Sequence, residues 1–592
     1  MSGIAGILDS SASVAEGAAA AARRMMGALA NRGQGGYQVW TDEGAGVALA
    51  VRGAGTCMGQ PARSQDTRWI AVFDGTIHNR ADLHRRLDPS TAAPESDAAL
   101  LAEAAARWGV ERALQAIDGS FAAALWDRQQ RTFVLARDPM GKRPLVWARM
   151  GKAVLFGSEA RAFSSIPGFA GHMDREALAL YLQRGWVPAP FTLHREVRKL
   201  AAGTMLVIKG GDAQVRRYWS AAERARSLAG AFTGGPSAAA ERLNRLLRAS
   251  VAQRIASDTQ VGVLLSGGAA PALIAAIARE LMPGPLRTVA LAFEGENASG
   301  ARAVAAALAT RHEEVRIADA DAPALVAGLA PMADEPFAAP GYLSTMLAAR
   351  AAREHVTVAL SGQGGDALFG LDGFLDTAVR TWRGARDSNS WLKRGVRALP
   401  GPVRGAFPGL DLLEAQGAAE TAVLMRALWR GIPTPLADMP RPMPAPEVED
   451  PRLQVLAAEV ETTLPDDVCA RCDRAGAAHG LDVRLPFLDG ALADLAFSLP
   501  DGLALSAFEE LLPRYLPDTP PPLPCAGPPL ARWLAGPLKD WAGDLLSPER
   551  LRGQGWLDPT AIARLVRRTR SGRGIAELWA VLMFQAWLDA QG

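Results

Sequence analysis

A Ser-Gly-Gly turn in the second half of the chain is the first feature whose residue types could do chemistry. The turn, Leu265-Ser266-Gly267-Gly268, follows a short apolar segment and precedes a helix-like one. In that setting backbone N–H groups and the helix dipole face a bound anion, and glycines let the anion approach closely. A Ser-Gly-Gly sequence alone is usually only a turn, so phosphate binding here depends on the surrounding segments.

Ser2 is the second candidate, because removal of Met1 would give it a free α-amine. A hydroxyl beside its own amine can act as a nucleophile, with the amine as the base. A serine at position two has no such meaning by itself, so this interpretation also depends on other residues.

Two further features have simpler structural explanations. Cys469 and Cys472 have the spacing of half a zinc site, but no second pair lies nearby in the sequence. We expect one of these thiols to face the core from a helix. The basic run 567–573 is typical of a solvated helix end, with contact to an anionic substrate or peptide as the alternative.

The segments that must position the candidates form two patterns. Short apolar segments at 69–73, 120–126 and 132–136 are bounded by polar residues, and an Ala-rich helical stretch covers 96–108. This pattern predicts an α+β domain over residues 2–215, in which strands pair with strands and helices cover the faces.

A different pattern begins at about residue 236, where helical and apolar strand segments alternate. The predicted elements are a helix at 238–255, a strand at 261–265, a helix from residue 271, and strands at 286–293 and 356–360. Such alternation predicts an α/β domain over 236–592, built on a parallel sheet whose ligands bind at the carboxyl ends of the strands. Proline-rich stretches at 433–446 and 517–529 are predicted loops.

Composition excludes several classes of protein. The 592 residues are 49% hydrophobic and 21% charged, which is typical of a globular chain and not of a disordered one. The net charge of +2 gives no basis for a nucleic-acid partner, and no apolar run reaches the ~18–20 residues of a membrane span. Four cysteines cannot form a disulfide framework in a chain of this length, and no signal peptide is evident. We therefore expect a cytoplasmic protein without nucleic-acid or membrane partners.

Several short motifs occur in the order found in one known family. The opening Ser2-Gly3-Ile4-Ala5-Gly6 resembles the Cys-Gly-Ile-x-Gly start of class II glutamine amidotransferase domains. The motifs that follow in each half are Asn31-Arg32-Gly33, Asp74-Gly75-Thr76, Ser96-Asp97, Arg137 to Leu145, Ser266-Gly267-Gly268, Asp334-Glu335-Pro336, Ser361 to Gly370, Asp473-Arg474 and Arg484 to Asp489. Together the two halves resemble the glutamine-hydrolysing asparagine synthetase family over nearly the whole chain.

This resemblance implies a fold, two sites and two cofactors. It implies an N-terminal nucleophile hydrolase-like sandwich domain that releases ammonia from glutamine. It further implies an ATP-pyrophosphatase-like domain that adenylates a carboxylate with ATP and Mg²⁺, so that an amine can attack the acyl-adenylate. On this basis the substrate-binding candidates are Arg52 and Asp97, the metal candidate is Asp366, and the ATP-binding candidates are Leu265, Ser266, Gly267, Gly268, Ser361 and Gly362.

The synthetase half departs from the family pattern at charged positions. Ala270 stands where the family has a magnesium-binding Asp, and Pro271 stands where it has a Ser. Gln363 occupies the position of a catalytic Glu, and an amide cannot accept a proton at neutral pH. The loop at 523–527 has no lysine to stabilise developing charge, and Arg471 stands where relatives often have lysine.

The glutaminase half departs in a similar way. Ser2 replaces a cysteine, whose thiolate is far more accessible at neutral pH than an alkoxide. Asp74 replaces an Asn that donates to the oxyanion, and a carboxylate there repels the developing charge. Gly75 matches the family, whereas Thr76 replaces a substrate-contacting Glu. We therefore expect little or no glutamine hydrolysis.

Two hypotheses of different classes follow. The first is an enzyme for ATP-dependent amide formation on a small-molecule carboxylate or a peptide, using free ammonia or an amine. Lasso-peptide macrolactam cyclases and β-lactam-forming relatives are such cases, and they carry an idle glutaminase domain. The second is a catalytically inactive paralogue that acts as a partner or regulatory scaffold, as a homodimer or in complex with an active relative. The second explains all the substitutions together.

Overall fold

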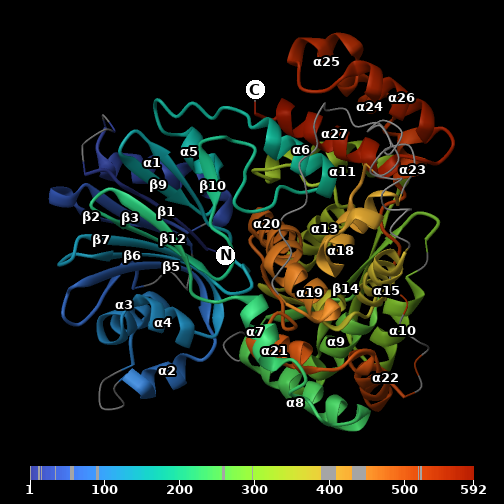
Figure 1. The fold of residues 1–592 in the computed structure, drawn as a ribbon, viewed down its shortest axis with the longest axis horizontal. Coiled ribbons are helices and arrows are strands. Elements are labelled where there is room, and N and C mark those ends of the chain that lie inside the picture. The colour runs from blue at the N-terminus through green and yellow to red at the C-terminus, as the bar shows by residue number, and fades with distance from the viewer. Residues whose placement is uncertain are drawn as a thin grey trace.

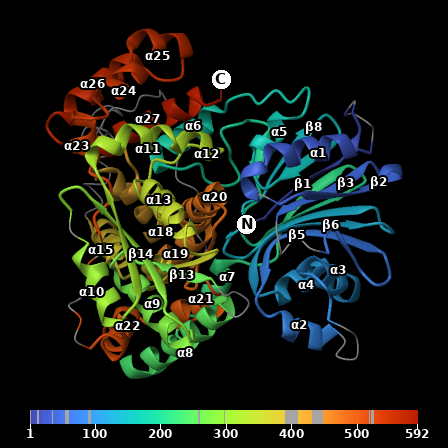
Figure 2. The same cartoon turned by 180° about the vertical axis from the view of Figure 1, so that it is seen from behind.

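The computed structural model divides into two blocks that lie side by side (Figures 1 and 2). It describes residues 2–591 except 11–13, 15, 34, 54–58, 88–92, 256–259, 297, 389–408, 430–447, 518, 520–522 and 524. Within these residues no helix combines the length and apolarity that crossing a bilayer requires. One block is built on antiparallel sheets, and the other on a parallel sheet.

The N-terminal block contains two six-stranded antiparallel sheets. One has the order β10-β8-β9-β1-β3-β2 and the other β12-β11-β7-β6-β5-β4. The strands are β1 Ser2–Leu8, β2 Tyr37–Asp42, β3 Val47–Gly53, β4 Ala62–Arg63, β5 Trp69–Ile77, β6 Gly119–Asp127, β7 Thr132–Arg137, β8 Val146–Met150, β9 Ala153–Gly157, β10 Val197–Lys199, β11 Thr204–Lys209 and β12 Asp212–Arg217. The long strands are apolar along most of their length, so both faces of each sheet must be covered.

Helices cover the outer faces and a shared core fills the space between the sheets. Ile4, Val51, Val72 and Phe133 belong to one cluster that joins strands of both sheets. Helix α1 (Ala18–Ala28) and the short α5 (Arg161–Ser164) pack on the first sheet, and α3 (Asp97–Trp108) and α4 (Val110–Ala116) pack on the second. Figure 1 shows this order of helix, sheet, sheet and helix. Ser2 and Asp74 lie on facing sheets of this sandwich.

The C-terminal block is built on a five-stranded parallel sheet of order β15-β14-β13-β16-β17. Its strands are β13 Val261–Leu264, β14 Arg287–Phe293, β15 Arg311–Ile317, β16 Val358–Ser361 and β17 Asp482–Arg484. Leu264 pairs with Val289 on one side and with Ser361 on the other. The carboxyl ends of β13 and β16 therefore lie next to each other, and the residues that follow both strands meet at one edge.

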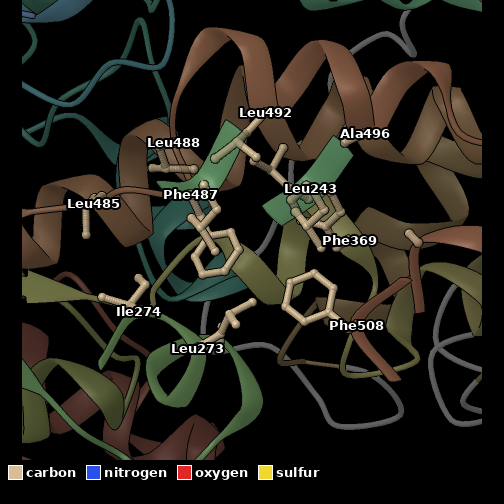
Figure 3. Packing of buried hydrophobic residues seen from close by; sticks show 14 of the residues in the cluster. Leu243, Leu273, Ile274, Phe369, Leu485, Phe487, Leu488, Leu492, Ala496 and Phe508 are labelled. Atoms are coloured by element: carbon tan, nitrogen blue, oxygen red, sulfur yellow. The ribbon is translucent and has the colours of Figure 1, made fainter. Parts of the chain in front are cut away.

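Helices cover both faces of this sheet. One core contains residues of α8 (Pro236–Ile255), α9 (Ala269–Leu281), α10 (Ser299–Ala307), α15 (Phe374–Asp387), α18 (Ala418–Arg426), α19 (Pro451–Ala458), α21 (Gly490–Ser498) and α22 (Leu503–Tyr515). The other contains residues of α6 (Arg175–Arg184), α13 (Gly341–Arg353), α20 (Ala470–His479), α23 (Leu530–Ala535), α24 (Lys539–Leu545), α25 (Pro548–Gln554), α26 (Pro559–Thr569) and α27 (Ile575–Asp589). Aromatic rings are central to the first core, where Phe487 and Phe508 pack among leucines (Figure 3).

One unusual helix connects the two blocks. Between α19 and α20 the chain forms a π-helical segment, Glu459–Cys469, with Pro465 inside it. π-Helical turns are rare and wide, and they often occur at functional positions. Asp466 in this segment accepts a hydrogen bond from the backbone N–H of Ala189 at 2.7 Å, and its other oxygen lies 3.5 Å from Arg137. The segment therefore contacts the N-terminal block directly.

The fold class predicted from the sequence is confirmed, with small shifts at element ends. The strand predicted at 69–73 extends to Ile77, and the helix predicted from Pro271 begins two residues earlier, at Ala269. Proline is tolerated there because the first turn of a helix needs no N–H from it. The loop predicted at 433–446 lies outside the described residues. In the 517–529 stretch the described residues form neither helix nor strand.

The aromatic core of the C-terminal block gives a prediction on stability. Phe487 is fully buried, with its ring centroid 5.8 Å from that of Phe508. We expect Phe487→Ala to lower the free energy of unfolding by about 3–5 kcal/mol, because the lost ring leaves a cavity. Leu505 is 41% exposed, and Leu505→Ala is the control, with a change within about 0.5 kcal/mol. Urea denaturation followed by tryptophan fluorescence measures both, and equal effects would contradict the assignment of Phe487 to the core.

Candidate functional site

The N-terminal candidate residues meet at the start of β1. Ser2 opens this strand opposite Gly53 of β3, and Asp74 lies in β5. The Ser2 hydroxyl donates to Oδ1 of Asp74 at 2.6 Å, and the Ser158 hydroxyl donates to Oδ2 at 3.3 Å. Ser2 is 4% exposed and Asp74 is fully buried. The hydroxyl proton of the nucleophile candidate therefore already points at a carboxylate of the protein itself.

A buried arginine occupies the space beside this pair. Nε of Arg32 donates to the Ser2 carbonyl at 3.0 Å, and its terminal nitrogens pair with Asp74 at 3.3 Å, Glu159 at 2.9 Å and Asp473 at 2.8 Å. Burial works against the charge of Arg32, but the three carboxylates raise its pKa well above the ordinary value. A guanidinium with its five fixed donors suits such a cluster of acids. We call Arg32 and these three carboxylates the Arg32 cluster.

Gly75 is required at its position by the backbone. Its φ is +137°, and a Cβ built there would lie 1.8 Å from the carbonyl oxygen of Ser120. Any other residue would clash with β6, because neither backbone at that point can move independently of the sheet. Gly75 therefore has a structural role whether or not Ser2 reacts.

The two residues predicted to hold glutamine bind groups of the protein instead. Arg52 donates to the carbonyls of Met26 at 3.0 Å and Gly35 at 3.1 Å. Asp97 accepts from the backbone N–H of Ile77 at 2.9 Å and from Arg80 at 2.5 Å. Both side chains thus already have hydrogen-bond partners where the resemblance implies contacts to substrate.

Charged groups from both blocks continue the Arg32 cluster across the interface. Asp473 also pairs with Arg143 at 3.3 Å, and its pKa is lowered to about 2 because Arg32 and Arg143 outweigh the effect of burial. Arg474 pairs with Asp334 at 2.7 Å. Asp473 and Arg474, noted in the sequence as a motif, therefore help to hold the two blocks together. The role of Arg32 in this cluster was not predicted from the sequence, because its partners are distant in the chain.

A second interfacial carboxyl behaves differently. Glu335 pairs with Lys199 of β10 at 2.6 Å and accepts from the backbone N–H of Leu193 at 3.3 Å. Burial dominates here, so the pKa of Glu335 is raised to about 7 although Lys199 lies beside it. This carboxyl therefore changes its charge near neutral pH.

A small enclosed cavity of about 20 Å³ lies between the two candidate sites. Its lining includes Thr76, next to the N-terminal site, and Cys472, next to the C-terminal one. A volume of this size holds about one water molecule. Burial and the nearby cations Arg254 and Lys142 lower the pKa of His78 in this lining to about 2, so the imidazole is neutral.

The C-terminal candidates line a crevice of about 290 Å³ at the carboxyl edge of the parallel sheet. The residues of the phosphate-binding prediction come together there, since Leu265, Ser266, Ser361, Gly362, Gln363 and Asp366 all contribute to its lining. Gly267 and Gly268 complete the turn that leads into α9. Strand alternation thus brings together residues about a hundred positions apart, as the sequence predicted.

The Ser-Gly-Gly turn is covered by a distant segment of the chain. The backbone N–H of Cys525 donates to the Ser266 carbonyl at 2.7 Å. Gly267 has φ +83°, and a Cβ there would lie 2.4 Å from the Leu523 carbonyl oxygen. Leu523 therefore lies directly against the turn, and only a glycine fits at position 267.

Ala270, at the position where the resemblance implies a metal ligand, is part of the core. Ala270 is fully buried in the first turn of α9 and belongs to the same apolar cluster as Phe487. A Cβ added to Gly365 would lie 2.8 Å from the Cβ of Ala270. Pro271 is equally close to Gly362, since its nitrogen lies 2.4 Å from the corresponding Cβ position there. The two segments that should hold a metal between them pack directly against each other.

The surroundings of Gln363 match an amide. Its Nε2 donates to Oγ1 of Thr345 at 3.2 Å, and the thiol of Cys472 donates to its Oε1 at 3.3 Å. The Thr345 hydroxyl donates its own proton to the Gly341 carbonyl at 2.7 Å, so it can only accept from Gln363. A carboxylate at position 363 would place an oxygen against the Thr345 lone pairs.

Asp366 is the one acidic residue in the lining of the crevice, counted over the described residues. The residue as a whole is exposed, but its carboxyl is partly buried by its surroundings, and this burial together with the nearby Asp372 raises its pKa. Among the described residues that line the crevice, Arg471 is the single cation. Its Nε lies 3.1 Å from a carboxylate oxygen of Asp467.

The crevice offers few ligands for the magnesium and triphosphate that the resemblance implies. Mg²⁺ is held by one or two carboxylates together with phosphate oxygens and water, and the described lining supplies a single carboxylate, Asp366. Across the described part of the chain no three His, Cys, Asp or Glu side chains are grouped as metal ligands. Cys469 and Cys472, both buried, belong to no such group, and both carry free thiols.

Comparisons with known proteins agree with the two-block architecture. The family model described as asparagine synthase matches residues 242–589, and a model described as a glutamine amidotransferase domain matches residues 1–219. A Mycobacterium tuberculosis protein, provisionally named a glutamine-hydrolyzing asparagine synthetase, is 29% identical over 88% of this chain and 84% of its own length. Asparagine synthetase (glutamine-hydrolyzing) 1 of Bacillus subtilis is 24% identical over 89% and 87%. The carboxyethyl-arginine β-lactam synthase of Streptomyces clavuligerus is 32% identical over 42% and 44%.

The Arg32 cluster gives a prediction on stability. We expect Arg32→Met, which keeps the bulk but removes the charge, to lower the free energy of unfolding by about 3–5 kcal/mol, because buried carboxylates lose their counter-ion. Arg24 pairs with Glu16 at the surface and is the matched control. Arg24→Met should change stability by less than about 1 kcal/mol. Urea denaturation at pH 7.5 makes the comparison, and an equally small effect of Arg32→Met would refute the role of the cluster.

Glu335 gives a prediction on pH dependence. Its pKa of about 7 lies above the unfolded value of about 4.3, so the folded state binds more protons between these limits. Its contribution to stability is therefore full below about pH 4.3, and up to about 3 kcal/mol is lost as pH rises through 7. We expect the stability of the native chain relative to Glu335→Gln to fall between pH 5 and pH 8 in urea denaturation.

The control for Glu335 is a surface carboxyl. Glu280 is 51% exposed at its side chain, so the same difference measured with Glu280→Gln should be flat over this range. A flat difference for Glu335→Gln as well would show that Glu335 titrates at an ordinary pKa.

Proposed function

Because this chain belongs to the asparagine synthase family, we propose that it is a non-catalytic member, which keeps the two-domain fold as a scaffold. In this proposal neither glutamine hydrolysis nor ATP-dependent amide formation remains. The protein acts instead by binding a partner or a ligand. The observation that carries the proposal is the C-terminal crevice, where Asp366 faces solvent alone and Ala270 is sealed in the apolar core.

The N-terminal site supports the loss of glutamine hydrolysis. Attack on an amide carbonyl creates an oxyanion that needs hydrogen-bond donors aimed at it. Asp74 offers only acceptor oxygens at that place, and it accepts the Ser2 hydroxyl proton at 2.6 Å. A serine also lacks the accessible thiolate that makes cysteine nucleophilic near neutral pH. Arg32 is paired with three buried carboxylates, so its charge is not available to stabilise an oxyanion.

The C-terminal site supports the loss of adenylation. Adenylation by a family member needs a metal-bound triphosphate, and the described lining has one carboxylate where the family pattern has two. Restoring the second carboxylate at position 270 would bury a charge beside Gly365 and Phe487. The lining segment at 525–527 also brings no cation towards a leaving group. Removal of one such preorganised group commonly lowers a rate by ~10²–10³.

The interface between the blocks supports a scaffold role. Its ion pairs are in place, and so are the hydrogen bonds from Arg137 to the Pro465 carbonyl and from Lys142 to the Leu488 carbonyl, while the reactive positions differ from the family pattern. A structure held for binding needs a fixed arrangement of domains but no proton transfer. A second copy of the chain, or an active relative, is the kind of partner this proposal allows, and the protein then acts through that complex.

A second candidate is amide formation on a small-molecule carboxylate or a peptide, fed by free ammonia or an amine. One observation favours it, since the crevice is open and Asp366 faces into it. A relative named as a β-lactam synthase also forms an amide. In this candidate the N-terminal site is idle, and Asp366 holds the metal without Ala270.

A pyrophosphate-release assay separates the two candidates. We expect the purified chain with ATP, Mg²⁺, ammonia and aspartate to release pyrophosphate at the background rate, because the crevice lacks the second metal carboxylate. Calorimetry with ATP and Mg²⁺ should likewise show no metal-dependent binding. A turnover of about 1 s⁻¹ or faster, as enzymes commonly reach, would contradict the scaffold proposal.

A reversion variant sharpens this test. If loss of the carboxylate is what prevents metal binding, Ala270→Asp should raise the magnesium-dependent affinity for ATP about 10-fold or more. Ala269→Asp adds the same charge one residue earlier in the turn and is the matched control, expected to leave that affinity unchanged. If Ala270→Asp folds and binds no better, decay elsewhere in the crevice is the cause.

A further inference from the structure

We propose that the crevice at the carboxyl edge of the parallel sheet binds an apolar molecule that carries one protonated amine, with Asp366 as the counter-ion. This inference rests on the proposed function, because it assumes that the crevice no longer serves a magnesium-bound triphosphate. It assigns to the same space a ligand of the opposite charge.

Charge selects a cation. Asp366 is an exposed residue that lines the crevice, and no ion pair to it is found among the described residues. Arg471, the cation of the lining, has its charge balanced by the buried Asp467 at 3.1 Å. The pair Arg471–Asp467 is neutral as a whole, so the ionised Asp366 leaves the crevice with a net negative charge. A ligand ammonium is the complement of that charge, and in a crevice of low polarity the attraction exceeds its value in water.

The walls select an apolar body for the ligand. The crevice is lined by apolar side chains from two strands and one helix. These are Leu264 of β13, Val289, Leu291 and Phe293 of β14, and Ala348 of α13. The crevice has a volume of about 290 Å³, which is large enough to admit a small ring system. Pockets of this kind are mostly apolar with a few polar groups that fix the orientation. Asp366 supplies such a polar group at this site.

A distant segment of the chain closes one end of the crevice, at the Ser-Gly-Gly turn. Leu523 places its carbonyl oxygen against Gly267 and Gly300, and a Cβ on either would lie 2.4 Å from it. The Ser266 carbonyl accepts a hydrogen bond from the backbone N–H of Cys525. The segment at Leu523 and Cys525 therefore packs directly against the turn and forms one end of the crevice.

Three matched probes test the proposal on the full chain. 2-Phenylethylamine carries the ammonium, 2-phenylethanol has the same ring without charge, and 3-phenylpropanoate carries a negative charge. Binding is measured by saturation-transfer NMR and by calorimetry at pH 7.5 and low salt. We expect the amine to bind most tightly and the propanoate most weakly, in the order that the charge of Asp366 dictates.

Variants locate the interaction. Asp366→Asn should weaken binding of the amine about 10- to 100-fold, which corresponds to the loss of one charged hydrogen bond, and should leave 2-phenylethanol unchanged. Asp82→Asn, at an exposed carboxylate on α2 (Arg80–Leu87) of the other block, is the control and should change neither. Asp366 is exposed, so the variant should fold, and an unchanged melting temperature verifies this.

Two outcomes would overturn the inference. One is equal affinity of the amine for the native chain and for Asp366→Asn. The other is tighter binding of the propanoate, or of phenylalanine through Arg471, than of the amine. Failure of the proposed function looks different, because pyrophosphate release in the enzyme assay would refute it whatever the amine does. Without pyrophosphate release, a failed amine test refutes this inference alone.

Discussion

The positive charge of Arg32 lies where water does not reach, and much of the molecule is arranged around it. An unpaired guanidinium in such a place costs several kcal/mol, so acids must surround it. Asp74 and Glu159 come from the N-terminal block, and Asp473 comes from the C-terminal block. The two blocks therefore cannot separate without exposing or unpairing a charge. The same cluster fixes Asp74 and, through it, the hydroxyl of Ser2.

The two candidate sites differ in their electrostatics. In the N-terminal site charged groups fill the centre, since Ser2, Asp74 and Arg32 are all bound to one another. In the C-terminal crevice the described lining has one acid and one cation, and beside it Ala270 packs close to Gly365 in the apolar core. Both sites lie on an intact framework of sheets and covering helices.

Most of the predictions that could be made from the sequence came from local patterns of neighbouring residues. The strand before Ser266 and the helix after Gly268 follow from neighbouring residues, so the crevice was predicted where it lies. The role of Arg32 was not predictable in this way, because its partner Asp473 is 441 positions away in the chain. The partners of Gln363 show the same limit, since Cys472 contacts it from 109 positions away. Periodicity reports which face of an element is buried but not which element covers it.

The contacts of Gln363 make its position selective for an amide. Thr345 sends its hydroxyl proton to the Gly341 carbonyl, and Cys472 directs its thiol at the amide oxygen. A carboxylate at position 363 would have to draw the Thr345 hydroxyl away from that carbonyl before it gained a hydrogen bond there. The chemistry of this side chain is thus set by neighbours on two helices, so position 363 cannot be altered independently of them.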